Sequence, residues 1–300
     1  SYTATPCRDE LRGDDGRWVA GGDPTMVLDG TRFGAFRVAP TSDAGADEPE
    51  PCAIPFEVWP NIVRPEKGFV ANANNDPAGV TFDDDLAGDA FYIGGPWDVG
   101  ARADTIEQRL SALAASRRAT PDDMAALQGD HTSRTGQLLA PYLLAAIDRA
   151  ERAAADGATT GADASLAAAW ARGSDALSEV RTRIAAWVAA GAQAASGVET
   201  FYHAPTDQQR TDAAATMIFN AWLRTFNALI WDDEGVDFAF EPPEFGRARR
   251  LRTMLDFLGG RGDDNPGQFA SWTSATGESV FFDNVATTDV IETSDELIVQ

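Results

Sequence analysis

Apolar residues recur every three or four positions through an Ala-rich stretch, from about residue 101 to about residue 231, which predicts a run of amphipathic helices. One helix start is well marked. Thr120 is a suitable N-cap, Pro121 suits the first helical position, and the two aspartates that follow complement the positive end of the helix dipole. We expect this helix to reach about His131 and a second helix to begin near Ser133. The second helix carries an apolar stripe at helical spacing, made of Leu138, Leu139, Leu143, Leu144 and Ile147.

Further helices are predicted on the C-terminal side of a turn-rich break at residues 156–165. The periodicity places them at residues 165–172, 174–190 and 207–231, and another is expected from Glu244 to Leu258. The cap-like pair Thr293-Ser294 predicts one more helix start, shortly before Gln300. We expect that last helix to be cut off by the end of the sequence, which indicates a truncated chain.

Residues 1–100 differ in composition from the helical stretch. They are rich in Gly, Pro and Asp, and their short apolar segments, such as residues 33–38 and 68–71, are typical of strands joined by long loops. The sequence therefore predicts three parts: a strand and loop portion at 1–100, a helical subdomain at 101–231, and a return to the first portion at 232–300.

The charge of the chain restricts its partners. Among 300 residues, 47 Asp and Glu stand against 24 Lys and Arg, which gives a formal net charge of −23. Such a charge repels phosphate backbones and anionic lipid headgroups, so it argues against nucleic acid and membrane surfaces as partners. No apolar run approaches the roughly 18 residues that a membrane-spanning helix needs. The apolar content of 44% is ordinary for a globular chain.

Two cysteines, Cys7 and Cys52, each lie beside a proline in loop-like sequence. They are either unrelated buried thiols or the halves of a disulfide, and the loop-like surroundings favour the disulfide. A disulfide would place the protein in an oxidising compartment. The chain has no Cys-x-x-Cys pair and only two histidines, His131 and His203, which argues against a structural zinc site.

The candidate chemistry lies in residues 68–77 (GFVANANNDP). Three asparagines within four positions follow a short apolar run, as in a strand that ends in a tight turn. Asparagine adopts left-handed conformations and hydrogen-bonds its own backbone, so turn chemistry alone would explain the asparagines. The alternative is a carboxamide presented at a strand end, whose NH₂ group donates to a developing oxyanion. Composition by itself favours the turn.

This asparagine segment resembles the G-[FY]-x-x-N-x-N-[NSD] segment in the large subunit of the penicillin acylase (penicillin amidase) family of N-terminal-nucleophile hydrolases. Each further piece is weak by itself, but together they make the resemblance fairly specific over residues 52–147. They follow in the family's order: residues 54–56 (IPF) with Pro60 and Pro65, 89–92 (DAFY), 102–110 (RADTIEQRL), 120–133 (TPDDMAALQGDHTS) and 141–144 (PYLL).

The resemblance implies a mechanism and site residues. In this family the Oγ of an N-terminal serine of the large subunit attacks an amide, and the α-amino group of that serine is the base. The second Asn of N-x-N falls on Asn74, an oxyanion-hole donor that acts beside a backbone N–H. Arg102 matches an arginine that helps to fix the active-site Asn, and its alternative is a surface helix arginine. Asp89 lies where the family places a calcium-ligating aspartate, so a structural calcium ion is expected, while the chemistry needs no cofactor.

The N-terminus departs from the family pattern. The chain begins with Ser1, but Ser1-Tyr2-Thr3 does not match the family's S-N-x-W start, and Asn74 follows it too closely. We therefore expect the small subunit, the nucleophile-bearing first part of the large subunit and a C-terminal part to be missing, and the fragment alone to be inactive. Ala73 is small where relatives can be bulky, which leaves the shape of the acyl pocket open.

The sequence thus predicts an α+β fold, part of the family's αββα core with an Ala-rich helical subdomain. It predicts a central piece of a periplasmic or extracellular acylase that hydrolyses an N-acyl amide to a carboxylic acid and an amine. Penicillins, acyl-homoserine lactones and acylated peptides all stay open as substrates. Two alternatives remain: a non-catalytic helical binding or interaction module with an acylase-like sequence, and an autonomous hydrolase that uses Ser1.

Overall fold

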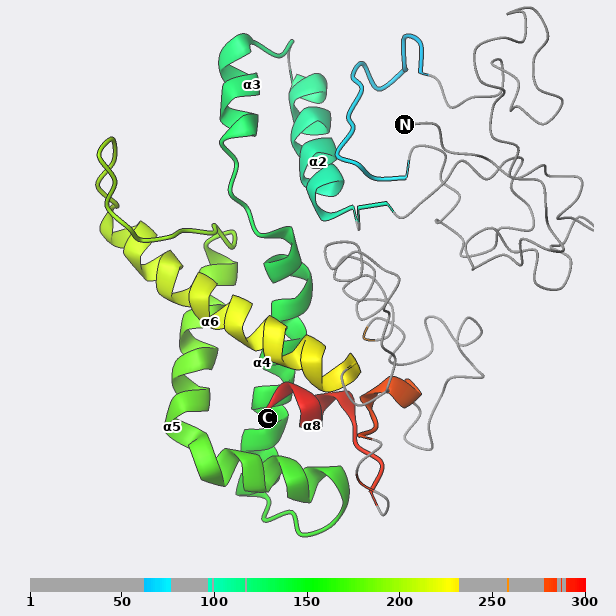
Figure 1. Cartoon of the computed structure of the whole chain (residues 1–300), viewed down its shortest axis with the longest axis vertical. Helices are drawn as coiled ribbons and strands as arrows, with labels where there is room; N and C mark the ends of the chain where they lie inside the picture. Colours follow the sequence, from blue (N-terminus) through cyan, green and yellow to red (C-terminus); the bar gives the residue numbers. More distant parts are fainter. Residues whose placement is uncertain are drawn as a thin grey trace, which may run out of the picture. The chain divides into compact units, whose positions relative to one another are not determined.

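The structure is a computed structural model, and it describes residues 62–76, 97–98, 100–116, 118–231, 258, 278–284, 287 and 290–300. The chain divides into two compact units, one formed by Ser1–Ala103 with Leu110–Ser116 and the other by Asp104–Arg109 with Arg117–Gln300. The helices of the described residues are α2 (Ala101–Ser116), α3 (Pro121–Gln128), α4 (Arg134–Ala155), α5 (Gly161–Ala189), α6 (Asp207–Trp231), the 3₁₀ helix η3 (Val280–Phe282) and α8 (Ser294–Ile298) (Figure 1).

The local signals in the sequence mark the starts of α3 and α4. The Thr120 hydroxyl accepts from the backbone N–H of Asp123 at 3.2 Å, and the Asp123 carboxylate accepts from the backbone N–H of Thr120 at 2.8 Å. This reciprocal pair is a capping box. Ser133 caps α4 in the same way, since its hydroxyl accepts from the backbone N–H of Gly136 at 3.1 Å. Both predicted starts are confirmed, although α3 ends at Gln128, earlier than the sequence predicts.

The two helices predicted at 165–172 and 174–190 are a single bent helix, α5. The bend lies at Gly173, whose backbone angles (φ −148°, ψ 32°) are not helical. Glycine adopts such angles at little steric cost, which is why the helix changes direction there. Helix α6 covers 207–231, as predicted.

The core of the larger unit lies between α4, α5 and α6, with α8 packed against all three (Figure 1). The predicted stripe on α4 faces this core, because Leu139, Leu143 and Ile147 are buried. A row of aromatic rings from α5, α6 and η3 continues it, and the ring centroids of Trp222 and Phe226 lie 5.3 Å apart. Buried apolar side chains in this cluster include Leu139, Leu143, Ile147, Ile184, Trp187, Phe219, Phe226, Ile230, Phe282, Leu297 and Ile298.

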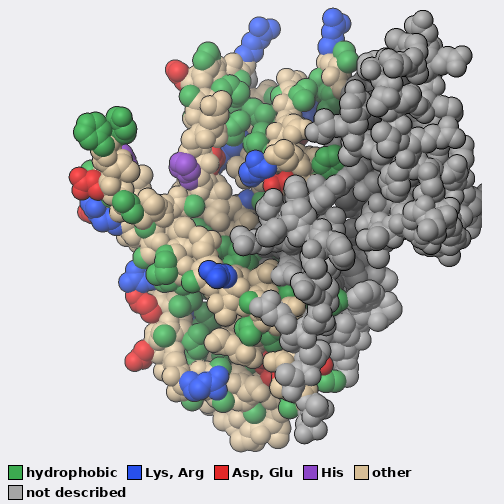
Figure 2. Space-filling view, viewed as in Figure 1, with side chains coloured by type: hydrophobic (Ala, Val, Ile, Leu, Met, Phe, Trp, Pro, Cys, Tyr) green, Lys and Arg blue, Asp and Glu red, His purple; other side chains and the backbone are tan. Residues whose placement is uncertain are grey.

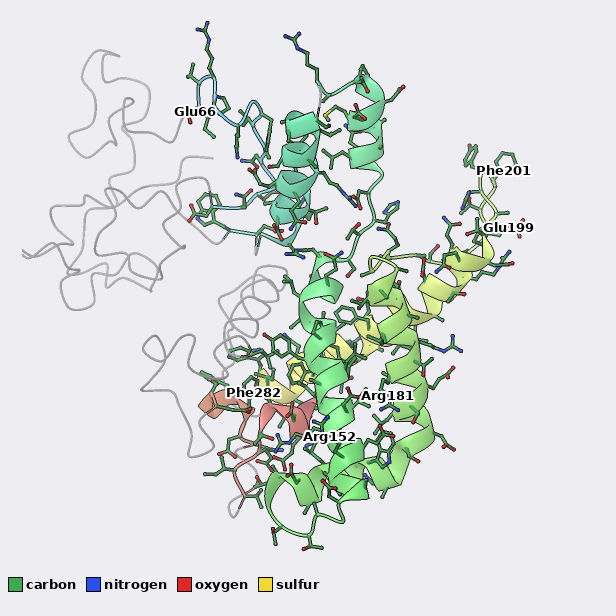
Figure 3. The ribbon with its side chains drawn as sticks, turned by 180° about the vertical axis from the view of Figure 1, so that it is seen from behind. Glu66, Arg152, Arg181, Glu199, Phe201 and Phe282 are labelled. Carbon is green, nitrogen blue, oxygen red and sulfur yellow. The ribbon has the colours of Figure 1, made fainter. Side chains whose placement is uncertain are left out.

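Two contacts fix the pairing of α4 with α5. A Cβ atom on Gly136 would lie 2.5 Å from Cη2 of Trp187, so the ring packs directly on the α4 backbone. Farther along the pair, the guanidinium of Arg181 on α5 lies 3.2 Å from Asp148 of α4 and also pairs with Glu151 (Figure 3). The absence of a side chain at Gly136 therefore allows the close approach, and the ion pairs hold the exposed side of the same interface.

The loop before α6 carries an exposed aromatic pair, Phe201 and Tyr202, at its tip. The backbone N–H of Thr200 donates to the carbonyl of His203 at 2.8 Å, which closes a narrow turn. Phe201 and Tyr202 at its tip are 94% and 92% exposed. Hydrophobic side chains gather at this tip, while Lys and Arg side chains are scattered over the described part of the visible face (Figure 2).

The prediction of an α+β fold with an αββα core is wrong for the described residues, which are mostly helical and contain no β-sheet. The apolar run 68–71, predicted as a strand, is irregular, and it follows a turn in which the N–H of Gly68 donates to the carbonyl of Pro65 at 2.9 Å. An apolar run becomes a strand only when a neighbouring strand pairs with its backbone, and no described segment does so here. The short apolar run at residues 68–71 was therefore not sufficient evidence for a strand.

Other predictions fall on residues that the structure leaves out. The proposed helix Glu244–Leu258 lies outside the described residues except for Leu258, which is buried. The three-part domain division stays a prediction for the same reason. None of the helices in the described part of the chain combines the length and the apolar character needed to cross a membrane.

Candidate active site around Asn74

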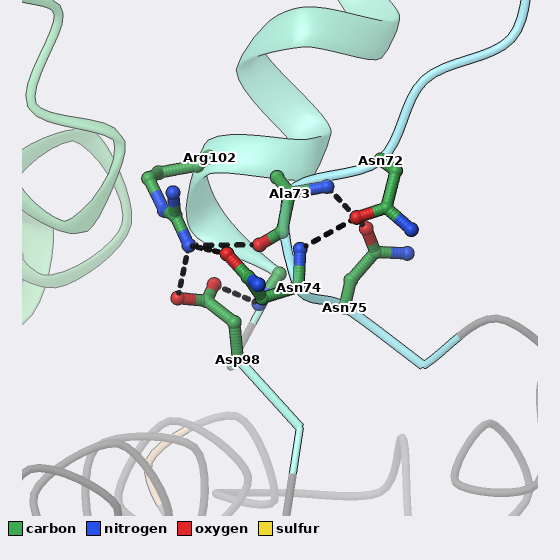
Figure 4. Close-up of polar contacts among 7 residues, drawn as sticks. Asn72, Ala73, Asn74, Asn75, Asp98 and Arg102 are labelled. Atoms are coloured by element: carbon green, nitrogen blue, oxygen red, sulfur yellow. Dashed lines mark hydrogen bonds and ion pairs between the residues drawn. The ribbon is translucent and has the colours of Figure 1, made fainter. Parts of the chain in front are cut away.

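The asparagine segment forms a tight turn that its own side chains close (Figure 4). The side-chain oxygen of Asn72 accepts from the backbone N–H of Asn74 at 3.0 Å, and that of Asn75 accepts from the backbone N–H of Ala73 at 3.1 Å. Asn74 has a φ of +63°, in the left-handed region that asparagine adopts more readily than most residues. Turn chemistry therefore accounts for Asn72 and Asn75, and it leaves the side chain of Asn74 for another use.

The side chain of Asn74 contacts Arg102, in the first turn of α2 (Figure 4). Nη2 of Arg102 donates to Oδ1 of Asn74 at 3.0 Å, and the same nitrogen donates to the carbonyl oxygen of Ala73 at 2.8 Å. A third acceptor, Oδ2 of Asp98, lies 3.1 Å from it. The structure thus brings together two of the predicted site residues, Asn74 and Arg102.

Arginine determines which way the Asn74 amide faces. A guanidinium has donors only, so the amide atom that faces Arg102 has to be the oxygen. The NH₂ group then lies on the other side of the amide, and among the described residues nothing accepts a hydrogen bond from it. Asn74 is exposed, so a ligand can reach this group. A positive charge at the oxygen polarises the amide and makes its N–H groups better hydrogen-bond donors.

Asp98 was not singled out from the sequence, yet it contacts both residues. Its backbone N–H donates to the carbonyl oxygen of Asn74 at 2.8 Å, and its Oδ2 pairs with Arg102. Its other oxygen, Oδ1, accepts from the backbone N–H of Gly100 at 3.1 Å. The signal that could have found Asp98 is its position four residues before Arg102, a spacing at which opposite charges meet around one helical turn.

Ion pairs hold α2 to the segment around Asp130. Nε of Arg109 lies 2.8 Å from Oδ2 of Asp130, and Arg134 pairs with Asp104. Burial alone raises the pKa of Asp130, but hydrogen bonds from Thr132 and Arg109 outweigh burial and bring the pKa below its usual value. Residues 102–110 and 120–133 both contributed to the family resemblance, and the ion pair between Arg109 and Asp130 joins them.

The other predicted site residues, Cys7, Cys52, Asp89 and Ser1, lie outside the described residues. Within the described ranges, no group of three or more His, Cys, Asp or Glu side chains is arranged to hold a metal ion. The disulfide and the calcium ligand therefore stay predictions.

Comparison of the sequence with known proteins and protein families identifies the family of this chain. Searches of curated proteins and of solved structures gave no match for this chain. A family model described as Penicillin amidase matches residues 4–300. This match includes Asn74 and Arg102, and it extends well beyond the residues on which the sequence resemblance rested. The chain therefore belongs to the penicillin amidase family of acylase-type hydrolases.

Proposed function

We propose that this chain is part of an acylase that hydrolyses an N-acyl amide to a carboxylic acid and an amine. In this proposal Nδ2 of Asn74 donates to the oxyanion of the tetrahedral intermediate, and Arg102 holds the Asn74 amide in orientation. Family membership supports the reaction class. The observation that carries the site assignment is the 3.0 Å hydrogen bond from Arg102 to Oδ1 of Asn74, because it leaves the NH₂ group on the other side of an exposed amide.

In the proposed mechanism, the role of the described residues in the chemical step is to supply the oxyanion donor, Asn74, and the arginine that orients it. A serine Oγ attacks the amide carbon, and the carbonyl oxygen gains the negative charge that Asn74 and a backbone N–H stabilise. Collapse of the intermediate breaks the C–N bond, the amine leaves with a proton, and water then hydrolyses the acyl-enzyme ester. In this proposal the nucleophile is an N-terminal serine outside this chain, whose α-amino group is the base. Ser1 is the alternative within it.

The proposal includes partners and surroundings that no observation on the described residues tests. The remaining parts of a penicillin-acylase-type enzyme, among them a small subunit, would complete the active site. A periplasmic or extracellular location, a disulfide between Cys7 and Cys52 and a structural calcium ion at Asp89 belong to the same proposal. The acyl group and the amine of the substrate stay open.

The decisive experiment is the Asn74→Asp variant of the full-length protein. A carboxylate keeps an oxygen for Arg102, so the contact that orients residue 74 survives, but the NH₂ donor is gone. We expect the variant to fold and mature while kcat on a chromogenic phenylacetyl or fatty-acyl amide falls by about 10²–10³, the usual effect of losing one oxyanion donor. Asn72→Asp is the matched control, because it keeps the oxygen that accepts from the N–H of Asn74.

Normal turnover by Asn74→Asp would rule out the donor role, since the NH₂ donor has been replaced by an oxygen that can only accept. If the wild-type full-length protein cleaves no such amide and its precursor is never cut in two, the non-catalytic binding module becomes the better interpretation. Product release by the 300-residue chain alone would instead favour Ser1 as the nucleophile.

A further inference from the structure

We propose that Asp98 is a positioning residue for the Asn74 amide, an inference that rests on the proposed function of Asn74. Asp98 contacts the pair at two places, and Figure 4 shows the contact of its side chain with Arg102. Its backbone N–H donates to the carbonyl oxygen of Asn74 at 2.8 Å, and its Oδ2 lies 3.1 Å from Nη2 of Arg102. One residue thus holds the backbone of the oxyanion donor and the side chain that orients it.

The backbone contact stabilises a conformation that is not the preferred one. Asn74 has a φ of +63°, where a residue with a Cβ atom is less stable than in the β or right-handed region. Both backbone polar groups of Asn74 are held in this conformation, the N–H by Asn72 and the carbonyl by Asp98. Because the backbone angles determine where the side chain starts, these two bonds limit the directions that the amide can take.

The side-chain contact restrains the arginine. The Arg102 side chain is 59% exposed, so its other bonds to Asn74 and Ala73, both to neutral oxygens, compete with water. The Asp98 carboxylate, whose side chain is 25% exposed, adds a charge-assisted bond to the same nitrogen. The carboxylate thereby favours the one rotamer in which Nη2 also meets Oδ1 of Asn74.

Both oxygens of Asp98 are used, which explains why an amide would not serve as well. Oδ1 accepts from the backbone N–H of Gly100 in the turn that leads into α2, and Oδ2 accepts from Arg102. An asparagine at this position has one acceptor oxygen. If that oxygen stays on the N–H of Gly100, an NH₂ group faces the guanidinium, and two donors oppose each other.

The test measures kcat and KM of the full-length protein carrying Asp98→Asn, alone and combined with Arg102→Ala. We expect Asp98→Asn to lower kcat by about twofold to tenfold, the range for one partly exposed charged contact, with KM unchanged. KM should not move because the donor acts on the charge of the intermediate. In the Arg102→Ala background the same substitution should have no further effect on kcat, because its action passes through Arg102.

Asp98→Ser is the second variant, because a serine hydroxyl can still accept from the N–H of Gly100 while Arg102 loses its carboxylate. It should reproduce the loss of kcat. Asp130→Asn is the matched control, since it weakens an ion pair with the same helix, at Arg109, and should leave kcat unchanged. Maturation and the melting temperature are followed for every variant.

Three results would overturn the role of Asp98. The first is an unchanged kcat in both Asp98→Asn and Asp98→Ser, and the second is an equal loss of kcat from Asp98→Asn in the wild-type and Arg102→Ala backgrounds. The third is failure of both single variants to mature. The third result would mean that Asp98 is needed for the fold as a whole, and not specifically for the position of the Asn74 amide. The Asn74→Asp variant separates this inference from the proposed function. If Asn74→Asp loses turnover and the Asp98 variants do not, only the inference fails; if Asn74→Asp turns over normally, the donor role itself fails.

Discussion

The guanidinium of Arg102 donates to the side-chain oxygen of Asn74 at 3.0 Å, across 28 positions of sequence. A donor-only side chain next to a carboxamide leaves one orientation for the amide, with its NH₂ group directed away from the arginine. In the proposed function, this contact leaves the NH₂ group of Asn74 as the donor that an oxyanion hole needs.

Replacement of Arg102 by lysine should reduce turnover without unfolding the protein. Lysine keeps the positive charge, but its side chain is one atom shorter, so its ammonium nitrogen cannot reach the position from which Nη2 of Arg102 contacts both Asn74 and Ala73. We expect kcat to fall by about tenfold, equivalent to one charge-assisted hydrogen bond of about 1.4 kcal/mol. Steady-state kinetics would measure this. Arg183→Lys on α5, which replaces a surface partner of Glu179, should have no effect, and equal kcat values for the two variants would contradict the prediction.

Asp130 should make stability depend on pH in the acid range. Its pKa in the folded protein is lowered, so the ionised carboxylate stabilises the fold above the unfolded-state pKa of about 3.9. That contribution is lost as the pH falls through the lower, folded-state pKa. We expect Asp130→Asn to lower the free energy of unfolding by about 1 kcal/mol at pH 7, and the deficit to shrink from about pH 4 downwards.

Urea unfolding of wild type and Asp130→Asn at several pH values would measure this deficit. Asp175→Asn is the control, because Asp175 is exposed on α5, and it should change the unfolding free energy little at any of these pH values. A deficit of the same size at pH 7 and at low pH would mean that Asp130 acts through its shape and not through its charge.

A methyl group at Gly136 should destabilise the packing of α4 on α5. The new Cβ would lie 2.5 Å from the Trp187 ring, which is buried and has little room to move. We expect Gly136→Ala to cost about 1–2 kcal/mol, after allowing for the better helix propensity of alanine. At Gly129 the nearest atoms would be 3.6 Å from a Cβ, an ordinary contact, so Gly129→Ala should be close to neutral in the same denaturant titration. A stabilised Gly136→Ala variant would show that Trp187 can shift.

The same substitution, Phe→Ala, can be compared at a buried and at an exposed phenylalanine. Phe226 is 1% exposed and lies between the rings of Trp222 and Phe282, whereas Phe201 is 94% exposed at the tip of its loop (Figure 3). Phe226→Ala should cost about 3–5 kcal/mol, since it removes buried area and leaves a cavity. Phe201→Ala should change stability by less than about 0.5 kcal/mol. Thermal and denaturant unfolding would measure both, and similar losses in the two variants would mean that the Phe201 tip is covered.

The helix starts and the family can be recognised from short stretches of sequence. The capping box of Thr120 and Asp123, the Ser133 cap and the bend at Gly173 all depend on residues within a few positions of one another, so the printed sequence contains everything that produces them. The family motifs likewise named Asn74 and Arg102, because a motif is a matter of residue type and order.

The contacts that these residues make depend on how distant parts of the chain fold together. An apolar run such as residues 68–71 needs a partner strand elsewhere in the chain to form a sheet, and in the described residues it has none. The direction of the Asn74 amide and the hydrogen bond from the Asp98 backbone to Asn74 depend on the chain folding back on itself between residue 74 and α2. Local rules extend over about one helical turn, so these contacts, 24 and 28 positions apart, could be read only from the folded chain.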